Sequence, residues 1–241
     1  MHTVQAIAHR GASAYAPENT RAAFDLALDM HADALETDIR LTQDGVLVLC
    51  HDATVDRVSD GTGAVADLTL DELKRLDFGA RFGPEFAGQR LLTVAAFLEE
   101  YGARLPLALE IKADYVVKPL YAMVRRMGLT DQVTFTSFDL SWLEAMRRAD
   151  AVVEIGYLTR QFDDAAIRQA RSIKLTQICP SAAAAAAEMV DKAHGFGLSV
   201  RAWGVNDDVL QERALQAGVD GMTTNWPDRL IARLRQLGWR Q

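Results

Sequence analysis

The stretch VQAIAHRGASAYAPENTRAAFDLALDMHADALETDI, residues 4–39, holds two short apolar runs on either side of a helical pattern. The runs cover residues 4–8 and 34–39, and between them Ala23 and Ala27 belong to one apolar stripe at helical spacing. A strand, a helix and a second strand in this order make up the unit of a parallel sheet with crossover helices. The stretch therefore predicts an α/β fold.

The same alternation continues to the end of the chain. We expect further strands at residues 107–111, 133–136, 152–157, 176–179, 198–203 and 221–224. With the first two, they give the number of units that a closed TIM barrel requires, and 241 residues is an ordinary length for one such barrel. We therefore predict a TIM (β/α)8 barrel, with residues 1–241 as a single domain.

Two features interrupt the alternation. Residues 46–50 form an additional apolar run, and Asp44-Gly45 before it is a strong hairpin signal. The stretch of about residues 53–90 then holds glycines, a short helix signal and three phenylalanines. Long connections inside a compact domain are usually functional. We expect this insertion to form a small cap over one end of the barrel.

Composition excludes several classes of protein. The net charge of -7 argues against a nucleic-acid partner, because a phosphate backbone needs a basic surface. The two cysteines, Cys50 and Cys179, form neither a disulfide framework nor a paired metal motif. The N-terminus lacks the pattern of a secretory signal, and no apolar run approaches the ~18 residues of a membrane helix. We expect a cytoplasmic protein that does not insert into membranes; the sequence is silent on its oligomeric state.

Three acidic residues stand at expected strand ends. Glu36 and Asp38 are two residues apart, so on a strand both side chains point to the same face. Glu110 reaches a matching height on the next parallel strand. Adjacent buried carboxylates repel each other, and a cation between them would remove that penalty. Three oxygen ligands favour one hard divalent cation, Mg²⁺ or Ca²⁺.

Basic residues at the same rim offer an alternative. Each acid could instead form an ion pair with Arg10, Arg40 or Lys112. An ion pair is the stronger interpretation for one acid alone, whereas three acids at strand ends favour the metal. Arg10 and Lys112 are also expected to bind the non-bridging oxygens of a phosphate. For Lys112, a salt bridge to a neighbouring acid is compatible with that role.

Two histidines reach the same rim. His9 ends the first strand, and a two-residue turn in the hairpin would place His51 opposite Asp38. A slip of one or two residues in that register still leaves His51 beside the carboxylates. Histidine titrates near neutral pH, so the pair can divide general base and general acid catalysis.

Short motifs run in order through nearly the whole chain: HRG at 9–11, PENT at 17–20, ETD at 36–38, HD at 51–52, LEIK at 109–112, SF at 137–138, WGVN at 203–206 and DGMTT at 220–224. Jointly, at these spacings, they resemble the glycerophosphodiester phosphodiesterase family. The resemblance implies metal-dependent hydrolysis of a small glycerophosphodiester to sn-glycerol 3-phosphate and an alcohol. It also implies that Glu36, Asp38 and Glu110 bind the cation, with His9 and His51 as the acid–base pair.

Other residues are expected to support the site. Glu18 could accept a hydrogen bond from Arg10 or join the outer shell of the metal. Asn19 is expected to brace the site or to cap the following helix, for which Thr20 is the other candidate.

Aromatic residues and two departures from the family pattern concern the substrate. Phe138 and Trp203 are expected to form an apolar wall, or alternatively to belong to the core. Gly204 and Asn225 stand where many members carry Thr and Asp. We place both at the far rim, where they bear on substrate preference more than on the chemistry.

Three other functions remain alternatives. A related barrel phosphodiesterase acting on a lysophospholipid or phosphoinositide would need an exposed apolar or basic docking surface. A non-catalytic barrel that binds a phosphorylated metabolite should have lost a histidine or an acid from the set. A metal-assisted lyase or isomerase would use a base such as Lys112. The head group, the order of the two histidines and the choice between water and a substrate hydroxyl as nucleophile are left open.

Overall fold

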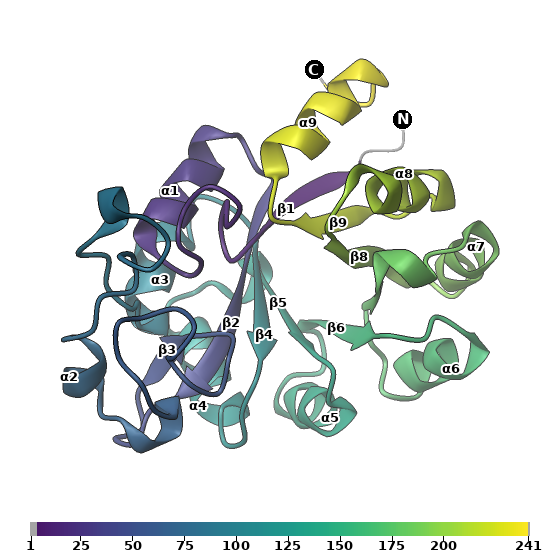
Figure 1. Cartoon of the computed structure of the whole chain (residues 1–241). Helices are drawn as coiled ribbons and strands as arrows, with labels where there is room; N and C mark the ends of the chain where they lie inside the picture. Colours follow the sequence, from purple (N-terminus) through teal and green to yellow (C-terminus); the bar gives the residue numbers. More distant parts are fainter. Residues whose placement is uncertain (1–3, 241) are drawn as a thin grey trace.

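Eight parallel strands close into a barrel in the computed structural model, which describes residues 4–240 (Figure 1). The neighbours around the barrel are β1-β9-β8-β7-β6-β5-β4-β2, and the pairing of β1 with β2 completes the ring. The strands are β1 (Gln5–His9), β2 (Ala34–Leu41), β4 (Leu107–Ile111), β5 (Val133–Ser137), β6 (Glu154–Thr159), β7 (Gln177–Pro180), β8 (Ser199–Val205) and β9 (Gly221–Thr224). The predicted TIM barrel is confirmed, and each strand lies close to its predicted bounds.

Helices follow the strands and cover the outside of the ring (Figure 1). They are α1 (Arg21–Asp29), α3 (Val94–Tyr101), α4 (Val117–Arg126), α5 (Leu140–Ala149), α6 (Asp164–Ser172), α7 (Ala187–Gly195), α8 (Asp208–Ala217) and α9 (Pro227–Gln236), with short 3₁₀ turns η3 (Thr130–Gln132) and η4 (Ala182–Ala184). Within residues 4–240, none of the helices is long and apolar enough to cross a bilayer.

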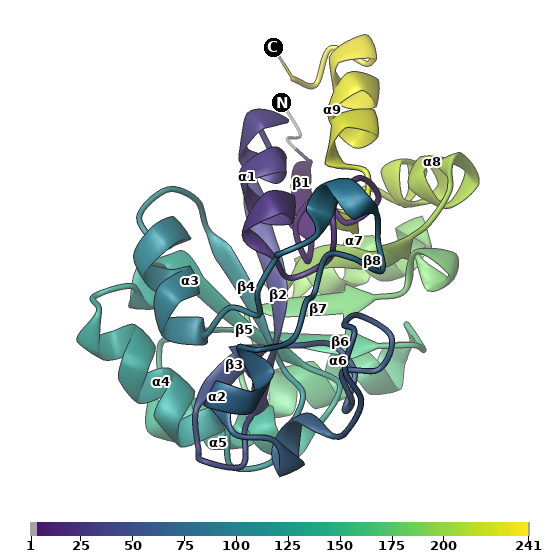
Figure 2. The same ribbon diagram turned by 60° about the vertical axis from the view of Figure 1, so that its left-hand side comes forward.

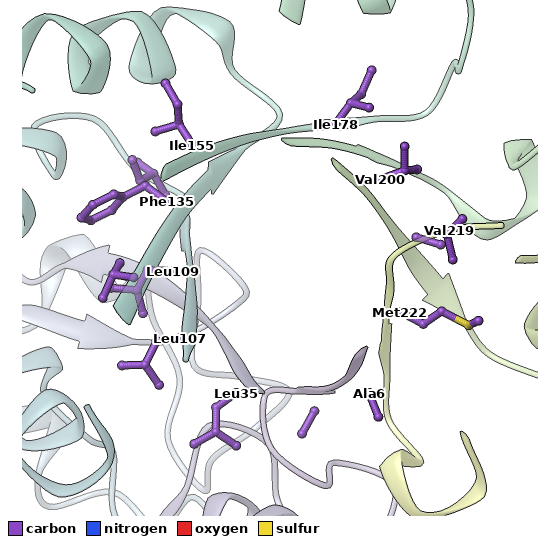
Figure 3. Close-up of a cluster of buried hydrophobic side chains, with 14 of the residues drawn as sticks. Ala6, Leu35, Leu107, Leu109, Phe135, Ile155, Ile178, Val200, Val219 and Met222 are labelled. Atoms are coloured by element: carbon purple, nitrogen blue, oxygen red, sulfur yellow. The ribbon is translucent and has the colours of Figure 1, made fainter. Parts of the chain in front are cut away.

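The period-two alternation of the strands separates the core from the site. Apolar side chains such as Leu35, Leu109 and Phe135 belong to the large buried cluster shared with the helices, and the side chains labelled in Figure 3 encircle the ring of strands. Their sequence neighbours Glu36 and Glu110 point to the opposite face, into the barrel. Alternate residues therefore build the core and carry the polar interior.

The loop between β1 and α1 is held close to that helix. Gly11 has φ +83°, and a Cβ there would lie 2.5 Å from the carbonyl carbon of Ala23. Only glycine tolerates both conditions. Thr20 is the N-cap of α1 and accepts a hydrogen bond from the backbone N–H of Ala23, so the expectation that Asn19 caps the helix is wrong. The Asn19 side chain instead contacts Thr37 and Asp38 on β2.

The predicted hairpin is present as β3 (Leu47–Leu49), antiparallel to β2. A two-residue turn would pair Arg40 with Leu49. Arg40 pairs with Val48 instead, so the register is shifted by one residue. The turn has three residues, 43–45, with Gly45 at φ +78°, and the backbone N–H of Thr42 donates to the Val46 carbonyl at 3.0 Å. His51 follows directly after this strand.

Residues 53–90, the cap segment, lie in front of β3 in Figure 2. They contain the turn η1 (Val65–Asp67), the short helix α2 (Leu70–Leu73) and the turn η2 (Pro84–Phe86). A second apolar cluster, separate from the barrel core, packs beneath them: Val48, Cys50, Val55, Val65, Leu73, Phe78 and Leu91. The residues before and after the cap segment meet at β3, where the N–H of Leu49 donates to the Leu92 carbonyl at 3.0 Å.

Candidate active site

Strand register brings four of the predicted site residues together. His9 on β1 lies beside Glu36 on β2, and Asp38 on β2 lies beside Glu110 on β4. The parallel pairing places these side chains on the inner face of the barrel, at the C-terminal ends of the strands, where barrel enzymes carry their active sites. His9, Glu36 and Glu110 line one cavity of about 420 Å³, and His51 lines it too.

The three acids form a cluster with the geometry of a cation site. Oxygen atoms of Glu36, Asp38 and Glu110 lie within 4.8 Å of one another, and all three residues are buried. Burial and the charge of Asp38 raise the pKa of Glu36 and of Glu110. Within the described part of the chain, Oδ1 of Asp38 accepts no hydrogen bond although it is buried. A buried carboxylate oxygen without a hydrogen bond and two acids that resist ionisation fit a bound divalent cation.

Two cations lie against this cluster. The Arg10 Nε atom is 3.0 Å from Asp38 Oδ2, and Lys112 Nζ is 2.6 Å from Glu110 Oε1 and 3.3 Å from Asp38 Oδ1. Burial alone would raise the pKa of Asp38, but the Arg10 and Lys112 charges together lower it. Arg40 lies elsewhere, because its guanidinium donates to the carbonyls of His51 and Lys112. Ion pairs and a candidate metal site thus coexist in one cluster.

The ring of His9 is fixed by a residue from the far end of the chain. Its Nδ1 lies 2.6 Å from the amide oxygen of Asn225, and its Nε2 lies 3.9 Å from Glu36 Oε2. An amide oxygen only accepts, so Nδ1 carries the proton and Nε2 is free toward the acids. Burial, with the nearby Arg10 charge, lowers the pKa of His9. The expected far-rim position of Asn225 is wrong, because β9 neighbours β1 in the closed barrel.

His51 has a charged partner. Its Nδ1 donates to Asp52 Oδ1 at 2.6 Å, and Arg57 Nε donates to Asp52 Oδ2 at 2.6 Å. Burial lowers the pKa of His51, whereas the Arg57 and His51 contacts hold the pKa of Asp52 below its usual range. The two histidines therefore differ: an amide faces one ring and a carboxylate faces the other.

Glu18 and Asn19 extend this network. Glu18 accepts from Arg10 at 3.1 Å and from Arg57 at 2.7 Å, and these contacts lower its pKa despite burial. Asn19 accepts from the Thr37 hydroxyl at 2.7 Å, and its amide nitrogen is 3.5 Å from Asp38 Oδ2. Both residues therefore touch groups that contact the acids.

Phe138 and Trp203 also line the cavity. Their rings meet edge to face, with centroids 5.2 Å apart. Trp203 is held by hydrogen bonds from its indole N–H to the carbonyls of Cys179 at 3.0 Å and Thr159 at 3.3 Å. Gly204 lines the cavity beside them. These aromatic residues form a wall of the site and are only half-buried.

Two arginines of this cavity were missed by sequence analysis. Arg201 is 4% exposed on β8 and donates to the Thr223 hydroxyl at 3.0 Å and to the side-chain amide oxygen of Gln177 at 3.1 Å. Arg160 directly follows β6, and its guanidinium lies 5.2 Å from the Phe138 ring centre. Sequence signals existed for both: a charge inside an apolar strand, and a basic residue at a strand end.

Comparisons with known proteins agree with this geometry. Residues 9–229 match the model of the glycerophosphoryl diester phosphodiesterase family. A glycerophosphodiester phosphodiesterase of Caldanaerobacter subterraneus is 35% identical over 238 residues, which cover 96% of this chain and 98% of the relative. A solved glycerophosphodiester phosphodiesterase of Agrobacterium tumefaciens is 28% identical, with a TM-score of 0.84 and coverage of 96% of this chain and 100% of the other. A phosphodiesterase of Oleispira antarctica, solved in complex with the product sn-glycerol-3-phosphate, is 26% identical, with a TM-score of 0.87 and coverage of 95% and 96%.

Proposed function

The chain belongs to the glycerophosphoryl diester phosphodiesterase family, and from this premise we propose that it hydrolyses glycerophosphodiesters to sn-glycerol 3-phosphate and an alcohol, as one catalytic domain with one divalent cation. One observation carries the proposal. Glu36 and Glu110, which form a buried cluster with Asp38, share a cavity with two histidines whose rings are held by different partners. The glycerol 3-phosphate bound by the Oleispira relative supports the same product here.

Glu36, Asp38 and Glu110 would hold the cation. Their all-oxygen donor set favours Mg²⁺ or Ca²⁺ over softer metals. When bound, such an ion offsets charge on a phosphate oxygen and lowers the pKa of a neighbouring hydroxyl or water. Arg10 and Lys112, already aligned on the acids, would bind the other non-bridging oxygens and stabilise charge that develops there.

His9 is assigned as the general base. Its Nε2 is unprotonated and points toward the acids, where the nucleophilic hydroxyl, of water or of the substrate, would lose its proton. Burial and the Arg10 charge favour the neutral ring, which a base requires. Asn225 keeps the proton on Nδ1 and so keeps Nε2 available.

His51 is assigned as the general acid. Burial lowers the pKa of His51, but the carboxylate of Asp52 at Nδ1 opposes that shift and favours the protonated ring, whose Nε2 proton would pass to the departing alcohol. Arg57 donates to Asp52 and to Glu18, and Glu18 also accepts from Arg10. This network connects the general acid His51, through Asp52, to the phosphate-binding Arg10.

Removal of metal should abolish turnover. Glycerol 3-phosphate release from a mixture of glycerophosphodiesters is expected to fall at least about 100-fold in chelator-treated protein and to return with Mg²⁺ or Ca²⁺. Glu110→Gln should not recover, whereas Glu154→Gln, an exposed acid at the start of β6, should behave as wild type. Turnover that survives complete metal removal would refute the metal-dependent mechanism. Metal binding with no cleavage of any diester would indicate a non-catalytic binding barrel.

Asn225 offers a test of the assignment of His9. Asn225→Ala removes the acceptor at Nδ1, so kcat is expected to fall about tenfold with little change in KM. Asn225→Asp restores an acceptor and should recover most of kcat. Steady-state kinetics of the two variants measure this difference. Equal losses of kcat in both would show that the residue acts through something other than this hydrogen bond.

A further inference from the structure

The cavity of the site is lined by charged groups of both signs. The acids Glu36 and Glu110 and both histidines belong to its lining. The lining also includes Phe138, Leu158, Arg160, Arg201, Trp203 and Asn206. Among these six residues, the charged groups are the two guanidiniums.

The two arginines contribute differently. Arg201 is buried and fixed by neutral acceptors. Arg160 is exposed and follows the end of β6, where its guanidinium lies over the ring of Phe138 at 5.2 Å. Lys112 Nζ lies 5.8 Å from the same ring centre. Two protein cations therefore already engage the Phe138 ring, to which a cationic group would otherwise bind.

The proton donor indicates where the head group lies. The oxygen of the leaving alcohol must come within hydrogen-bond reach of the general acid. His51 lines this cavity, whereas the neighbouring cavity of about 500 Å³, lined by Ser137, Asp139 and Trp142, contains neither histidine. The head group therefore begins in the cavity that Arg160 borders.

Resting on the proposed phosphodiesterase function, we propose that Arg160 selects against positively charged head groups. The preferred substrates are then glycerophosphodiesters whose alcohol is an uncharged polyol or carries negative charge. A trimethylammonium group beside Arg160 would meet like charge from its guanidinium. Hydroxyl or anionic groups would instead accept hydrogen bonds from the guanidinium.

The test compares kcat/KM for glycerophosphoglycerol and glycerophosphocholine in the metal-loaded enzyme. Wild type is expected to prefer glycerophosphoglycerol about tenfold, the size of a like-charge contact at a partly exposed site. Arg160→Gln should reduce the preference about fivefold, and Arg160→Glu should reverse it. Arg171→Gln is the matched control, because Arg171 also lies over a phenylalanine, Phe196 at 4.0 Å, but on α6 outside the cavity. It should leave the preference unchanged.

Three results would overturn the inference. Arg160→Gln could lower kcat/KM equally for both diesters, which would place the common glycerol moiety against Arg160. The preference could instead respond to Trp142→Ala and not to Arg160, which would direct the head group into the neighbouring cavity. Wild type could also cleave glycerophosphocholine as well as glycerophosphoglycerol. Failure to cleave any diester would refute the proposed function itself, and the head-group preference with it.

Discussion

Asp38→Asn is expected to lower kcat/KM about a thousandfold and to weaken Mg²⁺ binding sharply. Asp38 is fully buried between two other acids, with Arg10 on one carboxylate oxygen and Lys112 on the other. The amide has the same shape but no charge, so it removes an anionic ligand and leaves both cations without their shared counter-charge. Phosphate binding by those cations should suffer together with the metal site.

Calorimetric titration with Mg²⁺ and steady-state kinetics at increasing metal concentration would measure both effects. Asp114→Asn provides the control, since Asp114 accepts from the indole N–H of Trp142 outside the triad. That variant should bind metal and turn over as wild type. A circular dichroism spectrum unchanged from wild type would show that the Asp38 variant is folded. Normal metal affinity in this folded variant would contradict the assignment of the triad.

His51→Ala is expected to lower kcat about a thousandfold for diesters with an alkyl alcohol as leaving group. An alkoxide is a poor leaving group and must be protonated as it departs, and His51 with its Asp52 partner is the assigned donor. A p-nitrophenyl ester of glycerol 3-phosphate loses a stable anion instead. For that substrate the same variant should lose only about tenfold, because no proton is needed.

His9→Ala separates the two roles. A base that activates the nucleophile is required whatever the leaving group, so this variant should lose about a thousandfold on both substrates. His194→Ala is the control, because His194 also pairs with an acid, Asp220 at 2.8 Å, but lies outside the cavity of the site. The opposite pattern, with the aryl ester rescuing His9→Ala, would exchange the acid and the base.

The barrel could be predicted because its signal is local. Each strand is a short apolar run, and residues such as Leu35 and Phe135 must face the helices for the core to form. The side chains between them, including Glu36 and Glu110, then face inward without further information. The hairpin register was less determined, since Thr42 and Gly45 widen the turn by one residue in a way that the Asp-Gly pair does not specify.

Contacts that depend on closure could not be predicted in the same way. Asn225 reaches His9 only because β9 pairs with β1, which joins the two ends of the chain. Arg201 and Arg160 come from strands with no recognised motif at those positions, and their role depends on the shape of the cavity. Contacts between strands close in sequence were therefore found, whereas the contact that joins the first and last strands and the two arginines of the cavity were not.

The separate apolar cluster beneath the cap segment has a consequence for how this enzyme can diverge. The cap segment starts and ends near β3, and its apolar side chains pack in a cluster separate from the barrel core. Its length and sequence can therefore change in evolution without repacking the barrel. Arg57 connects the cap segment to the site, since it donates to Asp52 and Glu18. An exchanged segment would therefore need to return a guanidinium to that position to keep these hydrogen bonds.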